Sequence, residues 1–274
     1  MNNNRPFLFD CDLKPNKHSA HPFSGLGIIK NSRQHLLNNR KTNLFFLIEK
    51  RYSWMNKYIK ENNKGIELGR GTGIGALHIK SKHFELTDVL KNEWVTQIVD
   101  AHQMPFENSS LDFIITNNVI HHLSKPIVFL NECSRVLRKE GKLLIQETHL
   151  SLFMRILINI VRHEGYSYNV DAFDSEAICN DPNDPWSANL ALADLLFGDS
   201  KLFAEKVKYL KIDSKKYTEF FIWPLSGGVA HIIPVPNINR KLLELINFLD
   251  KIIISISKNI FPLQIQIVLS NNKM

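Results

Sequence analysis

Four glycines at alternate positions mark the stretch of sequence where chemistry is most readily expected. Residues 67–75 read Glu-Leu-Gly-Arg-Gly-Thr-Gly-Ile-Gly. Because glycine has no Cβ, a backbone built from it can turn sharply and approach a ligand closely. A turn of this kind between a first strand and a helix is typical of nucleotide-binding sites. Residues 71–76 also fit the G-x-G-x-x-A pattern of dinucleotide enzymes, so the glycines alone leave the nucleotide open.

Acidic residues at two positions narrow the choice of nucleotide. Glu67 directly precedes the glycines, where its charge would repel a pyrophosphate but attract the cationic amino acid end of S-adenosylmethionine (SAM). Asp88 follows the second expected strand, where a carboxylate can accept hydrogen bonds from both ribose hydroxyls. Asp88 serves NAD and SAM equally, so it is Glu67 that disfavours an NAD-dependent oxidoreductase.

The elements that must position these residues alternate between short apolar runs and helical stretches. This order predicts a doubly wound α/β fold, a parallel sheet with helices on both faces. The predicted strands are Lys64–Leu68, Phe84–Thr87, Trp94–Val99, Leu111–Thr116 and Lys142–Glu147. Helical periodicity between the last two of these strands predicts a helix from Ser124 to Gly141 that ends in a basic turn.

Outside this core the periodicity changes three times. The chain shows little pattern to about residue 40, and an amphipathic helix is expected from Leu44. An aromatic run at Tyr217–Trp223 predicts a return strand, and the end of the chain predicts a helix at Arg240–Lys258 and a last strand at Leu263–Ser270. The expected units are an N-terminal arm and helix (1–62), the core (63–150), a substrate-side insertion or lid with the return strand (151–230), and the C-terminal helix and strand (231–274).

A series of ordered motifs covers about a third of the chain. They are Gly65–Gly73, Leu86–Asp88, Val99–Phe106 (VDAHQMPF), Leu111–Leu123 (LDFIITNNVIHHL) and Glu132–Gly141 (ECSRVLRKEG). In this order they resemble the motifs of class I SAM-dependent methyltransferases, in particular those with methyltransferase type 11-like domains. The expected fold is then Rossmann-like, with seven mostly parallel strands, an antiparallel last strand, an N-terminal helical arm and an insertion after strand five.

The resemblance implies which residues hold the methionine and ribose parts of SAM. Glu67, Gly69 and Gly71 would cradle the methionine moiety. Gly73 belongs to the same turn, and Asp88 would hold the ribose.

It also implies the residues around the adenine and the sulfonium. Asp100 would bind the adenine amino group, Ala101 would offer its backbone amide, and Met104 would pack near the ring. Asn117 and Asn118, at the end of the fourth strand, would lie beside the sulfonium and the incoming acceptor.

Two adjacent histidines follow that strand. His122 is a candidate base for an acceptor hydroxyl because imidazole titrates near neutral pH. The alternative is that the histidines only pack and shape the pocket. A metal site at His121 and His122 is disfavoured, since adjacent side chains diverge on a helix and no third ligand stands at a suitable spacing. We therefore predict no metal.

The segment after the fifth strand, where methyltransferases of this type place substrate-recognition elements, concentrates polar side chains beside a glycine. His163 is the second candidate base, and Glu164, Tyr166 and Asp171 join His121 as candidates for acceptor binding. An ordinary polar loop is the alternative.

Composition limits the partners and the location. The net charge is +7, but the basic residues are scattered rather than clustered, which disfavours nucleic acid as a partner. The three cysteines form no C-x-x-C pair, and the N-terminus has no apolar signal region, so a cytoplasmic location is predicted. The apolar C-terminal third favours, as a secondary expectation, peripheral contact with a membrane or a lipid-linked acceptor.

These observations predict a SAM-dependent methyltransferase that methylates an oxygen, in preference to a nitrogen or carbon, of a small-molecule or glycan-precursor acceptor. A catalytically inactive SAM-binding regulatory or partner subunit is the alternative, and an RNA methyltransferase ranks below it. The acceptor and the oligomeric state stay open.

Overall fold

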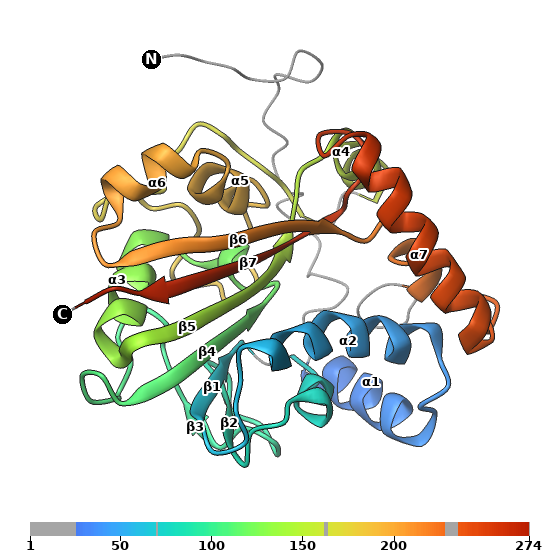
Figure 1. Ribbon diagram of the computed structural model, residues 1–274, viewed down its shortest axis with the longest axis horizontal. Coiled ribbons are helices and arrows are strands. Elements are labelled where there is room, and N and C mark those ends of the chain that lie inside the picture. The colour runs from blue at the N-terminus through green and yellow to red at the C-terminus, as the bar shows by residue number, and fades with distance from the viewer. Residues whose placement is uncertain (1–25, 70, 162–163, 228–234, 274) are drawn as a thin grey trace.

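The computed structural model describes residues 26–69, 71–161, 164–227 and 235–273 (Figure 1). Within these ranges a seven-stranded sheet has the order β3-β2-β1-β4-β5-β7-β6. Strands β1 to β5 pair in parallel, and β7 runs antiparallel to β5 and β6. The predicted Rossmann-like fold with an antiparallel last strand is confirmed.

The strands are β1 Lys64–Leu68, β2 His83–Asp88, β3 Gln97–Ile98, β4 Leu111–Asn117, β5 Leu137–Thr148, β6 Leu210–Thr218 and β7 Gln264–Asn271. The helices are α1 Leu26–Asn38, α2 Asn43–Ser53, α3 Pro126–Val136, α4 Leu152–Val161, α5 Leu192–Phe197, α6 Ser200–Lys206 and α7 Arg240–Ile256. Short 3₁₀ turns are η1 Trp54–Lys57, η2 Ile74–His78, η3 Ile120–His122 and η4 Pro224–Ser226.

Both faces of the sheet are covered, because the central strands are apolar on both sides. On β4, Ile114 packs into the cluster formed with α3, α5 and α6, whereas its neighbours Phe113 and Ile115 pack against α2 and η1. Figure 1 shows α3, α5 and α6 on one side of the sheet and α1, α2 and α7 on the other. Residues of α5 and α6 thus belong to the main core, although they lie in the expected insertion.

Three local predictions are wrong. The chain before residue 40 contains α1, which the sequence expectation left irregular. Helix α3 ends at Val136, and the expected basic last turn belongs to the start of β5, where Arg138 binds the Asp112 carboxylate at 2.9 Å. The third strand is only Gln97–Ile98, because it lies at the edge of the sheet and pairs with β2 alone.

The return strand also begins earlier than the aromatic run that was expected to form it. Strand β6 covers Leu210–Thr218, a segment with four lysine or aspartate side chains. It lies at the other edge of the sheet, where charged residues are common because they discourage pairing with a further strand. Because β6 is polar, a prediction based on apolar runs did not detect it.

Candidate active site

The glycine turn after β1 requires glycine at three positions. Gly69, Gly71 and Gly73 have φ values of 64°, 48° and 65°, a region that other residues rarely adopt. A Cβ on Gly69 would lie 2.6 Å from Val119 Cγ2, whereas one on Gly71 would meet no atom within 4 Å. The turn therefore packs tightly against the end of β4 and leaves room beside Gly71.

Two side chains from outside the turn bind its carbonyl oxygens. Arg33 Nη1 of α1 donates a hydrogen bond to Thr72 O at 2.6 Å, and Trp94 Nε1 donates to Gly71 O at 3.2 Å. The Arg33 guanidinium also lies 4.8 Å from the centre of the Trp94 ring. Neither residue was predicted, because nothing local in the sequence links α1 or the β2–β3 loop to this turn.

Glu67 is fully buried at the end of β1, and its carboxylate accepts a hydrogen bond from the Tyr52 hydroxyl of α2. Burial and the Glu67 charge raise the pKa of Tyr52 well above its usual value, so the hydroxyl stays a donor. A Cβ on Gly75 would lie 2.1 Å from the Tyr52 ring. The fourth glycine of the turn thus admits the residue that orients Glu67, a role the sequence did not reveal.

The other two acidic candidates lie at the ends of the neighbouring strands. Asp88 ends β2 and accepts a hydrogen bond from the Leu90 amide at 2.9 Å. Asp100 follows β3, accepts from the His102 amide at 2.8 Å, and keeps its side chain 60% exposed. Since β1, β2 and β3 are adjacent, the structure brings Glu67, Asp88 and Asp100 to one edge of the sheet, where ligands of such folds bind.

Of the three residues expected near the adenine, Ala101 and Met104 are buried, whereas Asp100 is exposed. Ala101 lies in the main core cluster. Met104 lies there too, and its amide donates to the Glu132 carboxylate at 2.8 Å. Their side chains can therefore form only the inner wall of an adenine pocket.

At the end of β4, the Asn118 backbone adopts the left-handed conformation, with φ of 55°. Its side-chain amide donates to Asn117 Oδ1 at 3.1 Å, and its side-chain oxygen accepts from the Thr148 hydroxyl at 3.3 Å. Asparagine tolerates this conformation better than most residues, and such backbone strain clusters at functional sites. Both asparagines lie where β4 meets the glycine turn.

The two histidines lie in η3 with ring centres 4.1 Å apart, so the expectation that their side chains diverge is wrong. His121 Nδ1 donates to Glu147 at 2.5 Å, and His122 Nδ1 donates to the carbonyl oxygen of Ser187 at 3.0 Å. Glu147, fully buried at the end of β5, also accepts the amides of Val119, Ile120 and Thr148. Each imidazole keeps its Nε2 for other contacts.

The electrostatic environments of the two rings are opposite. For His121, burial opposes the charged form, but the attraction and hydrogen bond of Glu147 prevail and raise its pKa to about 9. For His122, burial and the positive charge of His121 lower the pKa to about 4. At neutral pH the first ring is an imidazolium and the second is neutral.

These shifts predict a stability maximum near pH 6.5. The contribution of His121, whose pKa is raised, is complete below its unfolded value of 6.5 and is lost as pH rises through about 9. The contribution of His122, whose pKa is lowered, is complete above 6.5 and is lost as pH falls through about 4. Urea unfolding between pH 4 and 9.5 should show both limbs. His121→Asn should reduce the alkaline limb, to which His149 also contributes because its pKa is raised, and His122→Asn should reduce the acid limb. Unchanged limbs would contradict the assignment.

A third group joins the histidines. Glu164 Oε2 lies 4.0 Å from His121 Nε2, and one donor atom from each of His121, His122 and Glu164 lies within 4.8 Å of the others. Two imidazoles and a carboxylate are a donor set that could hold a divalent cation. The raised pKa of His121 means that a proton competes for the same nitrogen at neutral pH. The absence of a metal stays a prediction, and its reason is now the proton that competes for His121 Nε2 rather than the spacing of the ligands.

The remaining acceptor-side candidates are dispersed. His163 lies outside the described residues. Tyr166 is buried in an apolar cluster with residues of α4, and Asp171 is exposed and accepts from the Phe173 amide in a local turn. The structure instead brings residues 180–189 to the histidines: the Asn180 side chain donates to His121 O at 2.8 Å.

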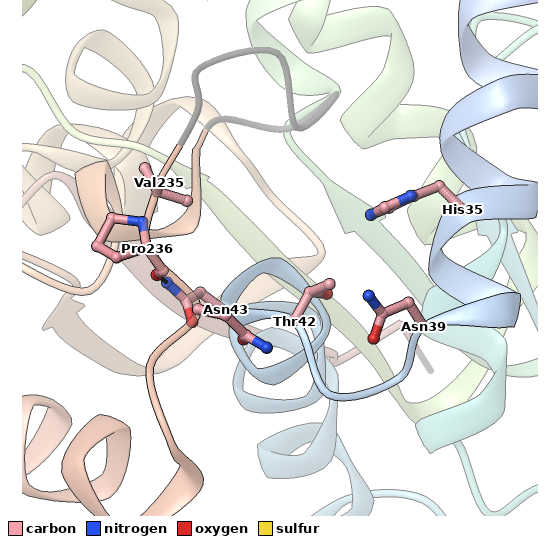
Figure 2. Close-up of a pocket in the computed structure, with 7 residues that line it drawn as sticks. His35, Asn39, Thr42, Asn43, Val235 and Pro236 are labelled. Carbon is pink, nitrogen blue, oxygen red and sulfur yellow. Dashed lines mark hydrogen bonds between the residues drawn. The ribbon is translucent and has the colours of Figure 1, made fainter.

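A separate small pocket lies between the α1–α2 connection and residues 235–237 (Figure 2). It measures about 120 Å³, well below the 300–1,000 Å³ typical of ligand sites. Buried Asn43 holds its wall together, donating to Leu225 O and Pro236 O and accepting from the Ile238 amide. This pocket is a junction between segments rather than a SAM site.

The sheet order and the glycine turn after β1 define the class: a Rossmann-like α/β fold of the class I methyltransferase type. The chain matches the family described as methyltransferase domain over residues 66–145. These residues therefore form a class I SAM-dependent methyltransferase domain. A search of curated proteins found no match.

The comparison with solved structures supports the fold through one of the two structures described next. A SAM-dependent methyltransferase from Archaeoglobus fulgidus aligns with 82% of this chain and 94% of its own, at 15% identity and a TM-score of 0.50. A candidate sarcosine dimethylglycine methyltransferase from Galdieria sulphuraria aligns with 84% of this chain and 87% of its own, at 13% identity and a TM-score of 0.47. The likeness to the Archaeoglobus fulgidus structure, at 15% identity, concerns the fold alone.

The residues present fit the cofactor of this family. The open space beside Gly71 lets a ligand approach the backbone, and Glu67 offers a buried carboxylate held by Tyr52. We expect Glu67 to hold the amino acid end of SAM and Asp88 and Asp100 its nucleoside. When bound, SAM supplies an electrophilic methyl group on a positively charged sulfur.

Proposed function

We propose that this protein transfers the methyl group of SAM to an oxygen of a small-molecule acceptor, such as a glycan precursor, with His122 as the base. The observation that carries the proposal is the position of the His122 imidazole, which lies in η3 directly after β4 and beside His121 and Glu164. Methyl transfer to a hydroxyl needs alignment and removal of one proton. The cluster around His122 offers a group for that proton.

The hydrogen bonds of His122 support this role. Because Nδ1 donates to Ser187 O, the lone pair of the neutral ring lies on Nε2. The low pKa keeps this nitrogen free of a proton at neutral pH. It also weakens the ring as a base, and the charge of Glu164, which favours the imidazolium, offsets part of that weakening. His121 is already protonated at neutral pH because Glu147 stabilises its charged form, so it cannot accept the proton of the acceptor. We therefore propose that His121 positions the adjacent His122 ring.

The surroundings of the histidines favour a small acceptor. The Ser187 carbonyl and the Asn180 side chain bind η3 and its histidines closely, so the chain folds over this side of the site. The sequence contains no dense run of basic residues, which disfavours RNA as the acceptor. We also propose a cytoplasmic location, which the free, buried Cys133 and Cys179 support.

Labelled methyl transfer from SAM into fractionated cell extract tests the activity. We expect labelled product of low molecular mass, and His122→Asn should reduce its rate about 100-fold or more while SAM affinity by calorimetry stays unchanged. His83→Asn, at the exposed start of β2, is the matched control and should keep full rate. No labelled product in any fraction would favour the alternative, a SAM-binding regulatory subunit.

A further inference from the structure

Helix α7 carries apolar side chains on its outer side as well as on the side that packs against the protein. The inner side buries Leu243 and Ile254 together with Asp250, whose carboxylate accepts the backbone amides of Phe220, Phe221 and Ile222. A surface helix of a globular protein normally presents polar residues to solvent on its outer side. The exposed apolar side chains of α7 are Leu242, Leu245, Phe248, Leu249, Ile252 and Ile256, the last of them 72% exposed.

Helix α4 repeats this arrangement beside the C-terminal end of α7. Phe153, Ile156 and Ile160 are exposed, at the spacing of one helix face, and Ile160 is 73% exposed. The amides of Leu152 and Phe153 donate to the carbonyls of Asn259 and Ile260, directly after α7. Figure 1 shows the two helices side by side at this end. We call the exposed apolar residues of α4 and α7 together the α4–α7 face.

A positively charged groove borders this face. It lies between β6 and the C-terminal part of α7, measures about 640 Å³, and is lined by Lys215, Lys216, Lys251 and Lys258. Burial and repulsion from nearby lysines lower the pKa of Lys215 and Lys216. Lys215 donates to a backbone carbonyl, whereas Lys216, Lys251 and Lys258 form no ion pair with any residue in the described ranges. The charge of the groove is thus left for an external anion.

We infer that the α4–α7 face docks on the surface of a membrane that contains anionic lipids. Apolar side chains would enter the boundary of the acyl chains, and the lysine groove would face the phosphates of the headgroups. Among the described residues no helix is long and apolar enough to cross a membrane, so the contact would be peripheral. The inference does not depend on the acceptor proposed above.

Charge favours a membrane over a second copy of this chain. A symmetric dimer through the α4–α7 face would bring the lysine groove close to its own copy, and like charges would repel. The acidic residues of α7 are already engaged: Asp250 is buried, and Glu244 accepts from Lys50 at 2.8 Å. A surface of anionic lipids complements both the apolar and the basic part.

Sedimentation with lipid vesicles tests the inference. We expect the full chain to bind vesicles of equal parts phosphatidylcholine and phosphatidylglycerol, and to bind pure phosphatidylcholine far more weakly. Each basic residue near an anionic surface contributes about a fivefold factor, so the triple variant Lys216→Glu, Lys251→Glu, Lys258→Glu should lower partitioning by 100-fold or more. Leu245→Ser with Phe248→Ser and Ile252→Ser should lower binding to both kinds of vesicle.

The matched control reverses three exposed lysines on the other side of the sheet, at or next to α6: Lys201→Glu, Lys206→Glu and Lys208→Glu. It changes the net charge equally and should retain most of the binding. Thermal unfolding and labelled transfer verify that each variant is folded. Equal losses in the two lysine triples, no binding by the wild type, or a wild-type dimer that the serine variant makes monomeric would each overturn the inference.

Discussion

Glu67→Gln is expected to weaken SAM binding about 30-fold to 4,000-fold in calorimetry at neutral pH. The Glu67 carboxylate is fully buried at the end of β1, so little water screens its attraction for a cationic ammonium group. Removing one partner of a buried charge pair costs about 2–5 kcal/mol, which corresponds to this range of affinities. Glutamine keeps the size of the side chain and removes the charge, and its carbonyl oxygen can still accept the hydrogen bond of the Tyr52 hydroxyl.

Companion variants separate the charge from its orientation. Tyr52→Phe removes the hydroxyl that binds Glu67 but leaves the carboxylate, and we expect a smaller loss of SAM affinity, about 10-fold. Glu61→Gln is the matched control, since that carboxylate is exposed and paired with Lys82. A folded Glu67→Gln protein with wild-type SAM affinity would show that the glycine turn has been assigned to the wrong ligand.

The core of the fold was predictable because its signal is local. Strand β1, the glycine turn and β4 are continuous apolar or glycine-rich runs, and their order fixes a parallel sheet. Edge elements were harder: β6 carries lysines because it is an edge strand, and β3 is two residues long. Helix α1 was missed because six polar residues, 30–35, separate the apolar residues at its two ends.

In the candidate site, the sequence predicted the position of those residues that lie at the ends of strands. Glu67, Asp88 and Asp100 follow directly from that rule, since adjacent parallel strands end at the same edge. Tyr52 and Ser187 could not be predicted, because each reaches the site from a distant segment through a contact that only the tertiary fold creates. One local clue was available: the fourth glycine of the turn leaves space for a ring.

The relation between the histidines was misjudged for a different reason. The divergence of adjacent side chains holds for a regular α-helix, but η3 is a three-residue 3₁₀ turn. Glu147 sets the geometry of η3. Its carboxylate accepts hydrogen bonds from the backbone amides of Val119 and Ile120 and from the His121 ring. A residue on β5 thus determines the arrangement of the loop after β4.

Glu147→Gln should therefore destabilise the protein more than any other single change in this region, by about 3–5 kcal/mol in urea unfolding at pH 7. The substitution leaves the His121 imidazolium without its buried counter-charge. In the wild type, the carboxylate accepts hydrogen bonds from the backbone N–H groups of Val119, Ile120 and Thr148. The variant would place an amide NH₂ group, itself a donor, against some of these donors. Both effects act in the same direction.

Two further measurements tie this loss to the charge pair rather than to packing. The destabilisation should shrink at pH 9.5, where His121 is mostly deprotonated because its pKa is about 9. It should also shrink when His121→Asn is already present, since a double-mutant cycle removes the interaction only once. Glu205→Gln, exposed on α6, is the control and should change stability by less than about 0.5 kcal/mol. A loss for Glu147→Gln that is the same at both pH values and adds fully to that of His121→Asn would mean that Glu147 acts through its backbone contacts alone.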